Sequence, residues 1–540
     1  MAFNAIVLKT VISELNNLIG FKVDKVNEPD KNTIVLGLYG KSTHFNLLSS
    51  ISSNNFRFHL TNHQLKNPAI APNFCMLLRK HIIGFKIKQI NSFNLERIVF
   101  IELENTDNPN KSITKKLIIE LMGKHSNIIL TDENNIIIDS MRHTTVENNA
   151  QRDIYPTSRY ILPKENDFKT SNALLEFYNK FEPNIISMLD SNTDTIDKIY
   201  NSLEEIINNN KFKINIINNK DYNLIVDNTT DNYSLNYSLD NFYFDKESNE
   251  LFINYRNRVL TFILGTLKKY EKRLINIDNK ITECNDMDKY KLYGELITAN
   301  LYRLPTKNLE YIEVENYYDN CNTIKIPLDK RYFPSINAKR YFKKYNKLKN
   351  ALEIVNIQKE ETLSDINYIE SVIYELENCL SIEDIQNVYE EIEESDIFKN
   401  SLSKKNHNKE KNKCKKSKNL TKNKFASFNP LKYTIDGYTI LVGRNNKEND
   451  FLTTKFAKYN DIWFHTKDIH GSHVILKANT NETIPEEVIY ETAKLAAKHS
   501  KAKNSSNIPV DYCQISNVKK PNGSKPGMVI YKNNKTIIVK

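Results

Sequence analysis

The side chains best suited to chemistry gather in one stretch near the C-terminus, DIWFHTKDIHGSHVIL at positions 461–476. This stretch holds the only tryptophan of the chain, Trp463, and three histidines, His465, His470 and His473. A zinc site requires three or four converging ligands, usually with Cys or carboxylate partners at fixed spacing, and the H-x4-H-x2-H pattern does not supply them. We therefore predict no metal ion in this stretch.

The same stretch is better interpreted as a surface that contacts RNA. Trp and His rings stack on bases, and Ser472 with the backbone around Gly471 can approach a phosphate. Ser472 lacks the G-x-S-x-G turn of a hydrolase nucleophile, which argues against catalysis. A buried strand–loop–strand with satisfied histidines stays open as the structural alternative. The candidate RNA-binding residues of this region are Arg444, Asp461, Trp463, His465, Gly471, Ser472 and His473.

Two weaker candidates lie in the N-terminal region. The segment FCMLLRKH places Arg79 and Lys80 beside an apolar helical face, where they either contact phosphate or end a solvated helix. The run GLYG at 37–40 imitates the G-x-x-G loop that clamps a nucleic-acid backbone, but a plain hairpin turn is the stronger explanation. The chain contains neither G-x-G-x-x-G nor G-x-x-x-x-G-K-[ST], which argues against an ordinary dinucleotide-binding or P-loop enzyme. No catalytic constellation emerges, and we predict that the protein is not an enzyme and uses no cofactor.

Charge is distributed unevenly along the 540 residues. The net charge is +10, yet residues 126–400 are net acidic, whereas residues 1–125, 401–424 and 430–540 are net basic. Two basic ends suit a protein that contacts a polyanion, although a generally lysine-rich composition produces the same excess. There is no run of about 18 apolar residues, no signal-peptide pattern and no C-x-x-C pair. We therefore predict a cytoplasmic protein with reduced thiols and no membrane partner.

Short apolar runs and turns predict the elements that carry the N-terminal candidates. Strands such as 33–40 alternate with turns, a helix is expected over 73–82, and residues 116–132 predict strand, glycine turn, strand. This pattern indicates an α+β domain.

Turn chemistry is most informative in the C-terminal region. Asp436-Gly437 lies between apolar runs and predicts a hairpin, and a helix is expected to end near Lys501. The pair Asn533-Asn534 predicts the turn of a final hairpin. These elements indicate a compact α/β domain from about residue 430 onward.

Hydrophobic periodicity predicts two long helices in the acidic middle. One heptad seam comprises Leu260, Ile263, Leu267, Tyr270, Leu274, Ile277 and Ile281, and a second comprises Leu348, Leu352, Val355, Ile366, Ile369, Ile373, Leu376 and Leu380. We predict an antiparallel coiled-coil arm, and two ordinary bundle helices are the alternative. The lysine tract at 401–424 cannot bury a core, and it is either a phosphate-attracting tether or a solubilising linker.

Seven motifs in order resemble the NFACT family, formerly described as fibronectin-binding proteins. They are NPAIAPNFCMLLRKHIIG (67–84), GKHSNIILTD (123–132), DKYKLYGELITANLY (288–302), AKRYFKKYNKLKNA (338–351), GRNNKENDFLT (443–453), DIWFHTKDIHGSHVIL (461–476) and KKPNGSKPGMVIY (519–531). The resemblance covers nearly the whole chain and implies an α+β multidomain protein. Its expected parts are a glycosylase-like N-terminal domain (1–165), a helix-hairpin-helix-like region (166–250), an antiparallel coiled-coil arm (251–400), a basic linker (401–429) and a C-terminal α/β RNA-binding domain (430–540).

The resemblance implies a role in ribosome quality control. Bacterial members of the family bind a stalled large (50S) ribosomal subunit that still carries peptidyl-tRNA and recruit alanyl-tRNA. They support template-free addition of alanine, which marks the nascent chain for degradation. A small heat-shock-type RNA-binding protein is a further implied partner. Because ribosomal RNA would form the peptide bonds, the protein is expected to be a scaffold that delivers tRNA.

The resemblance also implies a tRNA site in the N-terminal domain. The family has an Asp-Arg pair where this chain has Glu96-Arg97, which on composition alone is an ordinary surface ion pair. The family's N-terminal Asp appears here as Asn4, and its D-I-P-G-S-H motif has His470 in place of proline. The implied tRNA-binding residues are Glu96, Arg97, Glu120, Leu121 and Met122.

Two other classes of protein stay open as alternatives. A fibronectin-binding surface adhesin would require export, for which the sequence offers no signal peptide or wall anchor. A nucleic-acid-processing enzyme with a glycosylase-like domain would require a catalytic residue at the extreme N-terminus, where Met-Ala-Phe-Asn supplies neither a proline nor an acid pair.

Overall fold

The protein folds as a mixture of helices and sheets in two compact units, here described from a computed structural model. One unit is Met1–Glu250 and the other is Leu251–Lys540. The mixed, multidomain class expected from the sequence is therefore confirmed. The structure describes residues 3–105, 113–145, 152–163, 168–189, 195–218, 220–228, 234–304, 309–319, 321–399, 428–479 and 484–540. The predicted tether at 401–424 lies outside these residues.

A nine-stranded antiparallel sheet organises the described part of the first unit, in the order β4-β3-β2-β1-β5-β6-β7-β8-β9. The run 116–132 forms β7, a short turn and β8, as its glycine-centred pattern predicts. The strands are β1 (Lys22–Asp30), β2 (Thr33–Gly40), β3 (Thr43–Ser50), β4 (Arg57–Leu60), β5 (Lys86–Ser92), β6 (Ile98–Asn105), β7 (Ile113–Glu120), β8 (Asn127–Thr131) and β9 (Ile137–Ser140).

Both faces of this sheet are covered, because successive side chains of a strand point to opposite sides. Val99 and Ile119 join a large core on one face, whereas Ile98 and Ile118 join a smaller cluster on the other face. The helices and the hairpin that accompany the large core are α1 (Ala5–Leu15), α2 (Asn73–Ile82), α3 (Ser171–Asn179), α4 (Pro183–Ile186), α5 (Ile196–Asn209), β10 (Phe212–Ile217) and β11 (Asp221–Val226).

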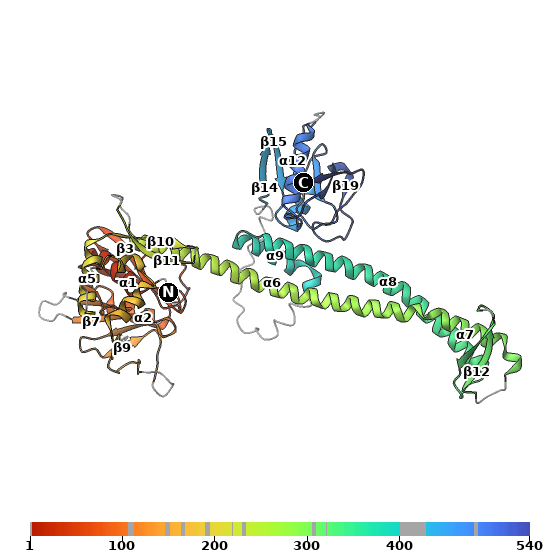
Figure 1. Ribbon diagram of the computed structural model, residues 1–540, viewed down its shortest axis with the longest axis horizontal. Helices are drawn as coiled ribbons and strands as arrows, with labels where there is room; N and C mark the ends of the chain where they lie inside the picture. The colour runs from red at the N-terminus through yellow and green to blue at the C-terminus, as the bar shows by residue number, and fades with distance from the viewer. Residues whose placement is uncertain are drawn as a thin grey trace. The chain divides into compact units, whose positions relative to one another are not determined.

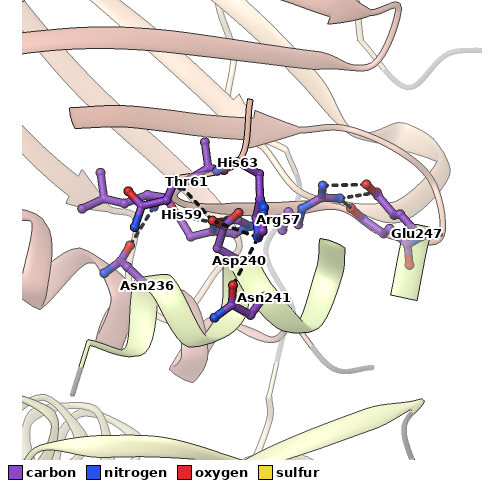
Figure 2. A network of polar contacts seen from close by, with 11 residues as sticks. Arg57, His59, Thr61, His63, Asn236, Asp240, Asn241 and Glu247 are labelled. Atoms are coloured by element: carbon purple, nitrogen blue, oxygen red, sulfur yellow. Dashed lines mark hydrogen bonds and ion pairs between the residues drawn. The ribbon is translucent and has the colours of Figure 1, made fainter. Parts of the chain in front are cut away.

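A polar network fastens β4 to the first turns of the long helix α6 (Leu235–Asn285), as Figure 2 shows. Arg57 donates two hydrogen bonds to the Glu247 carboxylate, at 2.5 and 2.9 Å. Asp240 accepts a hydrogen bond from the backbone of Asn62 at 2.9 Å. Charge-assisted, two-pronged contacts of this kind fix both position and orientation, so the start of α6 is held firmly against the sheet.

His59 takes part in this network as a neutral ring. Its Nδ1 lies 2.8 Å from the carbonyl oxygen of Leu60 and 3.9 Å from the Asp240 carboxylate. Complete burial lowers the pKa of His59 to about 3, with a further contribution from Arg57. The close approach of His59 to Asp240 is therefore not an ion pair near neutral pH.

In the second unit, the part of α6 that follows residue 250 and helix α8 (Pro334–Asn378) run side by side in opposite directions (Figure 1). Ile263 of α6 and Ile369 of α8 are fully buried in one shared hydrophobic cluster. Further along, Lys359 pairs with Asp278 at 2.8 Å. The elements next to these helices are α7 (Met287–Ala299), β12 (Tyr311–Asn316), β13 (Asn322–Pro327) and α9 (Ile382–Glu394).

The C-terminal part of the second unit contains a six-stranded antiparallel sheet, in the order β14-β15-β17-β16-β18-β21. Helix α12 (Glu486–Lys498) packs Ala493, Ala496 and Ala497 into its core. The elements are β14 (Leu431–Ile435), β15 (Tyr438–Val442), α11 (Asn446–Phe451), the π-helical turn η5 (Leu452–Phe456), β16 (Ile462–Thr466), β17 (Val474–Leu476), β18 (Ile508–Gln514), β19 (Val518–Lys519), β20 (Ile530–Tyr531) and β21 (Lys535–Val539).

The two hairpins predicted for this region have different outcomes. Asp436 and Gly437 both have positive φ, +46° and +84°, and join β14 to β15, so that hairpin is confirmed. The hairpin predicted around Asn533-Asn534 is wrong, because β21 pairs with β18, whereas β20 pairs with β19. Among the helices that the structure describes, none is both long and apolar enough to cross a membrane.

Candidate nucleic-acid interface

The five residues expected to bind tRNA lie at one end of two paired strands. Ile98 of β6 pairs with Glu120 of β7, and the Leu121 amide donates a hydrogen bond to the Arg97 carbonyl at 2.8 Å. Residues 96–97 and 121–122 are therefore neighbours although they are more than twenty positions apart in the sequence.

Arg97 is half-buried at this end of the sheet. Its guanidinium carbon lies 5.0 Å from the centroid of the Phe56 ring. Burial lowers the pKa of Arg97, and Glu96 and Tyr178 oppose that shift. Arginine keeps its charge far above neutral pH, so a positive, planar group is presented on an aromatic support. Such a group can make a two-pronged contact with phosphate or with a base edge.

Glu120 and Leu121 lie beneath the surface. Leu121 belongs to the large core, and Glu120 has no exposed area. The Glu120 carboxylate forms an ion pair with Arg152 and accepts a hydrogen bond from the Tyr160 hydroxyl at 2.7 Å. Glu120 thus holds the segment that closes the smaller face of the sheet. Nothing in the sequence around Arg152 and Tyr160 pointed to these two partners.

The other N-terminal candidates have different surroundings. Met122 is half-buried against the smaller cluster. Arg79 donates hydrogen bonds to the Val26 carbonyl at 2.8 Å and to Asn27 at 3.3 Å, so it anchors α2 to β1. Lys80 is exposed on the same helix and remains the better placed of the two for a phosphate.

In the C-terminal domain, the sheet gathers the aromatic candidates into one stack. Trp463 is fully buried on β16, and the His465 ring stacks on it with centroids 5.7 Å apart and planes 14° apart. His473, which precedes β17, meets both rings edge-on. Tyr531 adds a fourth ring, with its centroid 4.8 Å from that of Trp463. Tyr531 is a member of this cluster that sequence reasoning missed, although it ends the motif at 519–531.

Both histidines of the stack are neutral near pH 7. Burial lowers the pKa of His465 to about 4 and that of His473 to about 3. The His473 Nδ1 lies 2.7 Å from the Thr453 hydroxyl. A neutral imidazole does not attract phosphate, so the partly exposed His465 ring is suited to stacking on a base.

The remaining C-terminal candidates support the stack. Asp461 is buried, pairs with Lys477 at 2.7 Å and accepts from the Lys458 amide at 2.7 Å. Gly471 approaches the 499–500 backbone so closely that a Cβ would lie 3.0 Å from the Ser500 Cβ. The Ser472 amide donates to the His499 carbonyl at 2.9 Å. These residues therefore position the strand-to-strand connection.

Arg444 lines a second cavity together with Gly471 and Ser472. Its backbone amide donates to Glu448 at 3.0 Å, and its guanidinium lies 3.3 Å from Asp384 of α9. Within the residues that the structure describes, no group of three or more His, Cys, Asp or Glu side chains could hold a metal ion.

Comparison with known proteins finds similar sequences along the whole length of the chain. A family model described as "NFACT N-terminal and middle domains" matches residues 4–413, and one described as "NFACT protein RNA binding domain" matches residues 424–533. The chain is 33% identical over 578 residues to the Rqc2 homolog RqcH of Bacillus subtilis (strain 168), covering 100% of this chain and 98% of that protein.

More distant and partial matches have related descriptions. The ribosome quality control complex subunit NEMF of Homo sapiens is 28% identical over 159 residues, which are 28% of this chain and 14% of that protein. A solved structure of the C-terminal part of a fibronectin/fibrinogen-binding protein from Streptococcus suis is 31% identical, with a TM-score of 0.38, covering 53% of this chain and 94% of that one. The two family models and the full-length relative confirm the resemblance predicted from the motifs: the chain belongs to the NFACT family.

Proposed function

We propose that this protein is a ribosome quality control factor. It binds the stalled large (50S) ribosomal subunit with its peptidyl-tRNA, recruits alanyl-tRNA and directs template-free alanine tailing of the nascent chain. It acts in the cytoplasm as a scaffold and not as an enzyme. The observation that carries this proposal is that one chain aligns over its full length with RqcH and includes an RNA-binding family domain. The human relative, a ribosome quality control complex subunit, supports the same role.

The proposal assigns a part to each region of the molecule. Helices α6 and α8 form an antiparallel coiled-coil arm, which is supported by their shared buried cluster and by the Lys359–Asp278 pair. The N-terminal sheet binds tRNA at the end where Arg97 rests on Phe56. In the C-terminal stack, the partly exposed rings of His465 and Tyr531 face RNA. A glycosylase-like origin of the first domain, a helix-hairpin-helix-like middle region and a small heat-shock-type partner stay predictions.

Arg97 provides the experiment that tests tRNA recruitment. Arg97→Ala removes a charge-assisted contact worth about 1.5–3 kcal/mol, which corresponds to a roughly ten- to hundred-fold loss of tRNA affinity. The measurement is the tRNA that co-purifies with the tagged full-length protein on large subunits, together with tail length on a stalled reporter. Large-subunit binding should persist.

Two variants control this experiment. Lys88→Ala removes one exposed cation from the neighbouring strand β5 and should keep both tRNA and tails. Arg97→Lys keeps the charge but not the planar fork, so it should fall between the wild type and Arg97→Ala. If Arg97→Ala retains tRNA and tails, the pair 96–97 is a surface ion pair only. Fibronectin binding without any bound RNA would favour the adhesin instead.

A further inference from the structure

A cavity of about 620 Å³ opens beside the aromatic stack of the C-terminal domain. Its volume lies within the range of about 300–1,000 Å³ that is usual for ligand pockets. One wall comes from the β16–β17 connection and includes His465, Asp468 and His470. The other comes from the loop that ends in β20 and includes Gly527, Ile530 and Tyr531.

The lining of this cavity combines aromatic and apolar side chains with polar ones, which include Asn367 of α8, Asp468 and Ser524. His465, behind which Trp463 is stacked, and Tyr531 provide ring surfaces. Met528 and Val529 add apolar surface, and the Tyr531 hydroxyl is turned to Asp511, to which it donates at 2.8 Å. Among the described residues, no acceptor lies within hydrogen-bonding distance of Trp463 Nε1. The rings suit a flat base, and the acidic residue Asp468 in the lining disfavours a phosphate inside the cavity.

Backbone geometry holds both walls in place. Asp468 has a φ of +55°, a conformation that residues other than glycine adopt rarely and that is concentrated at functional sites. Gly527 has a φ of +76°, and a Cβ there would lie 2.6 Å from the Asn446 Oδ1. The lysines of the same loop are engaged, since Lys520 pairs with Asp450 at 2.6 Å and Lys525 pairs with Asp365. The loop is thus pinned around the cavity.

Positive charge lies outside the cavity. Lys467 follows β16 and is exposed, and Lys519 and Lys532 are exposed at the two ends of the loop that forms the second wall. A recess with ring surfaces inside and cations outside matches a single-stranded nucleic acid, whose base enters the recess while its phosphates stay outside. Bases of an A-form duplex are not accessible in this way, because their deep groove is too narrow for side chains.

We propose that this cavity binds one unpaired nucleobase of a single-stranded RNA segment. The base stacks on His465 and Tyr531, and the flanking phosphates lie near Lys467, Lys519 and Lys532. This inference rests on the proposed function, because it names the part of the RNA that the C-terminal domain recognises. It adds Tyr531 and the loop 521–531 to the RNA-contacting residues.

The single tryptophan makes this inference directly testable. The full-length protein is titrated with a labelled uridine hexanucleotide and with a hexamer of the same phosphates that lacks bases. Affinity is followed by anisotropy, and Trp463 emission is excited at a wavelength that tyrosine does not absorb. The base-bearing RNA should change the emission and bind about five-fold or more tightly than the abasic RNA, because base stacking contributes that much per base.

A pair of matched variants tests whether the base binds in this cavity. Ile530 is 55% exposed at the cavity, and Ile538 is 60% exposed on β21 outside it. Ile530→Asn adds no charge opposite Lys519, so it should weaken binding of the base-bearing RNA about five-fold or more and leave the abasic RNA unchanged, whereas Ile538→Asn should change neither. Cellular RNA that carries 4-thiouridine can be crosslinked to the peptide 519–531. Sequencing of the crosslinked RNA then shows whether the base comes from ribosomal RNA or from tRNA.

The outcomes separate the inference from the proposed function. Equal affinity for base-bearing and abasic RNA with unchanged Trp463 emission overturns the base site but leaves RNA binding intact. Equal effects of Ile530→Asn and Ile538→Asn likewise overturn it. Absence of binding to any RNA, including large subunits, removes the proposed function itself and the inference with it.

Discussion

Asn4 shows how one amide group can join two distant parts of the first unit. Its side-chain oxygen accepts from the amides of Ile6 and Val7, at 2.9 and 3.0 Å, and so caps α1. Its side-chain nitrogen donates to Glu182 at 2.8 Å. Glu182 is fully buried, and burial raises its pKa to about 7. The NFACT resemblance predicted an aspartate at this position, and the structure explains what an amide does there instead.

Asn4→Asp should therefore destabilise the first unit in a pH-dependent way. Aspartate caps a helix as well as asparagine, but it places a second carboxylate against Glu182 and removes the donor. We expect a loss of about 1–3 kcal/mol near pH 7.5 and a smaller loss near pH 5.5, where the two carboxyl groups can share a proton. Chemical denaturation of the full chain at both pH values measures this. Adding Glu182→Gln should restore stability, and no rescue would contradict the direct contact.

The burial of His473 should make the stability of the C-terminal domain sensitive to acid. Burial lowers its pKa from an ordinary 6.5 to about 3, so the unfolded state binds a proton below pH 6.5 while the folded state does not. The stabilisation is complete above pH 6.5 and is lost as the pH falls from 6.5 toward 3, by about 2 kcal/mol at pH 5. Trp463 emission during denaturation, compared between wild type and His473→Gln, reports this domain. A wild-type slope unchanged by the substitution would argue against a buried, neutral His473.

At the scale of elements, fully buried side chains hold the two long helices together. Ile263 of α6 and Ile369 and Val372 of α8 have no exposed area. Tyr368 is also buried, and its hydroxyl donates to Glu391 of α9 at 2.7 Å. Helix α8 is therefore packed on two sides, by α6 and by α9, and its buried surface is broader than one heptad seam.

Neighbouring positions on α6 test this packing. Ile263 is fully buried, whereas Leu264 is 39% exposed. Ile263→Lys buries a charge without a partner and should cost about 3 kcal/mol or more, with weaker large-subunit binding. Leu264→Lys adds the same charge on the solvent side and should change stability by about 0.5 kcal/mol or less. Thermal unfolding and limited proteolysis between residues 251 and 399 give the comparison. Equal behaviour of the two variants would rule out the packed helix pair.

At the scale of the whole molecule, charge and family membership indicate the same kind of partner. The chain has a net charge of +10, and residues 1–125 and 401–540 are net basic whereas residues 126–400 are net acidic. Each phosphate contacted by Lys or Arg releases counterions, so affinity for ribosomal RNA should fall steeply with salt.

This predicts that the protein co-sediments with free large subunits at low salt and is released as salt increases. A plot of the logarithm of affinity against that of salt concentration should be linear, with a slope of about −0.7 to −0.9 per phosphate contact. Lys519→Gln with Lys532→Gln should reduce the slope by about two contacts if both lysines touch phosphate. Co-sedimentation mainly with small subunits or intact ribosomes would contradict the proposed function.

The sequence alone determined those parts of the structure that depend only on residues close together in the chain, such as turns and the bounds of helices. Asp436-Gly437 predicts its hairpin because both residues tolerate positive φ, and the helix at 73–82 has the predicted bounds because its apolar positions repeat with helical spacing. The seam positions Ile263 and Ile369 are buried for the same reason. The motifs that resemble the NFACT family are likewise present in the sequence itself.

Only the tertiary structure decided which side chains are covered and by what. Leu380 continues the heptad pattern, yet it is 86% exposed, because α8 ends at Asn378. Glu120 is polar and yet fully buried, because Arg152 and Tyr160 reach it from a separate segment. Strand β21 pairs with β18 rather than with the strand just before it. Burial and strand pairing depend on residues far apart in the chain, and periodicity or turn chemistry does not specify them.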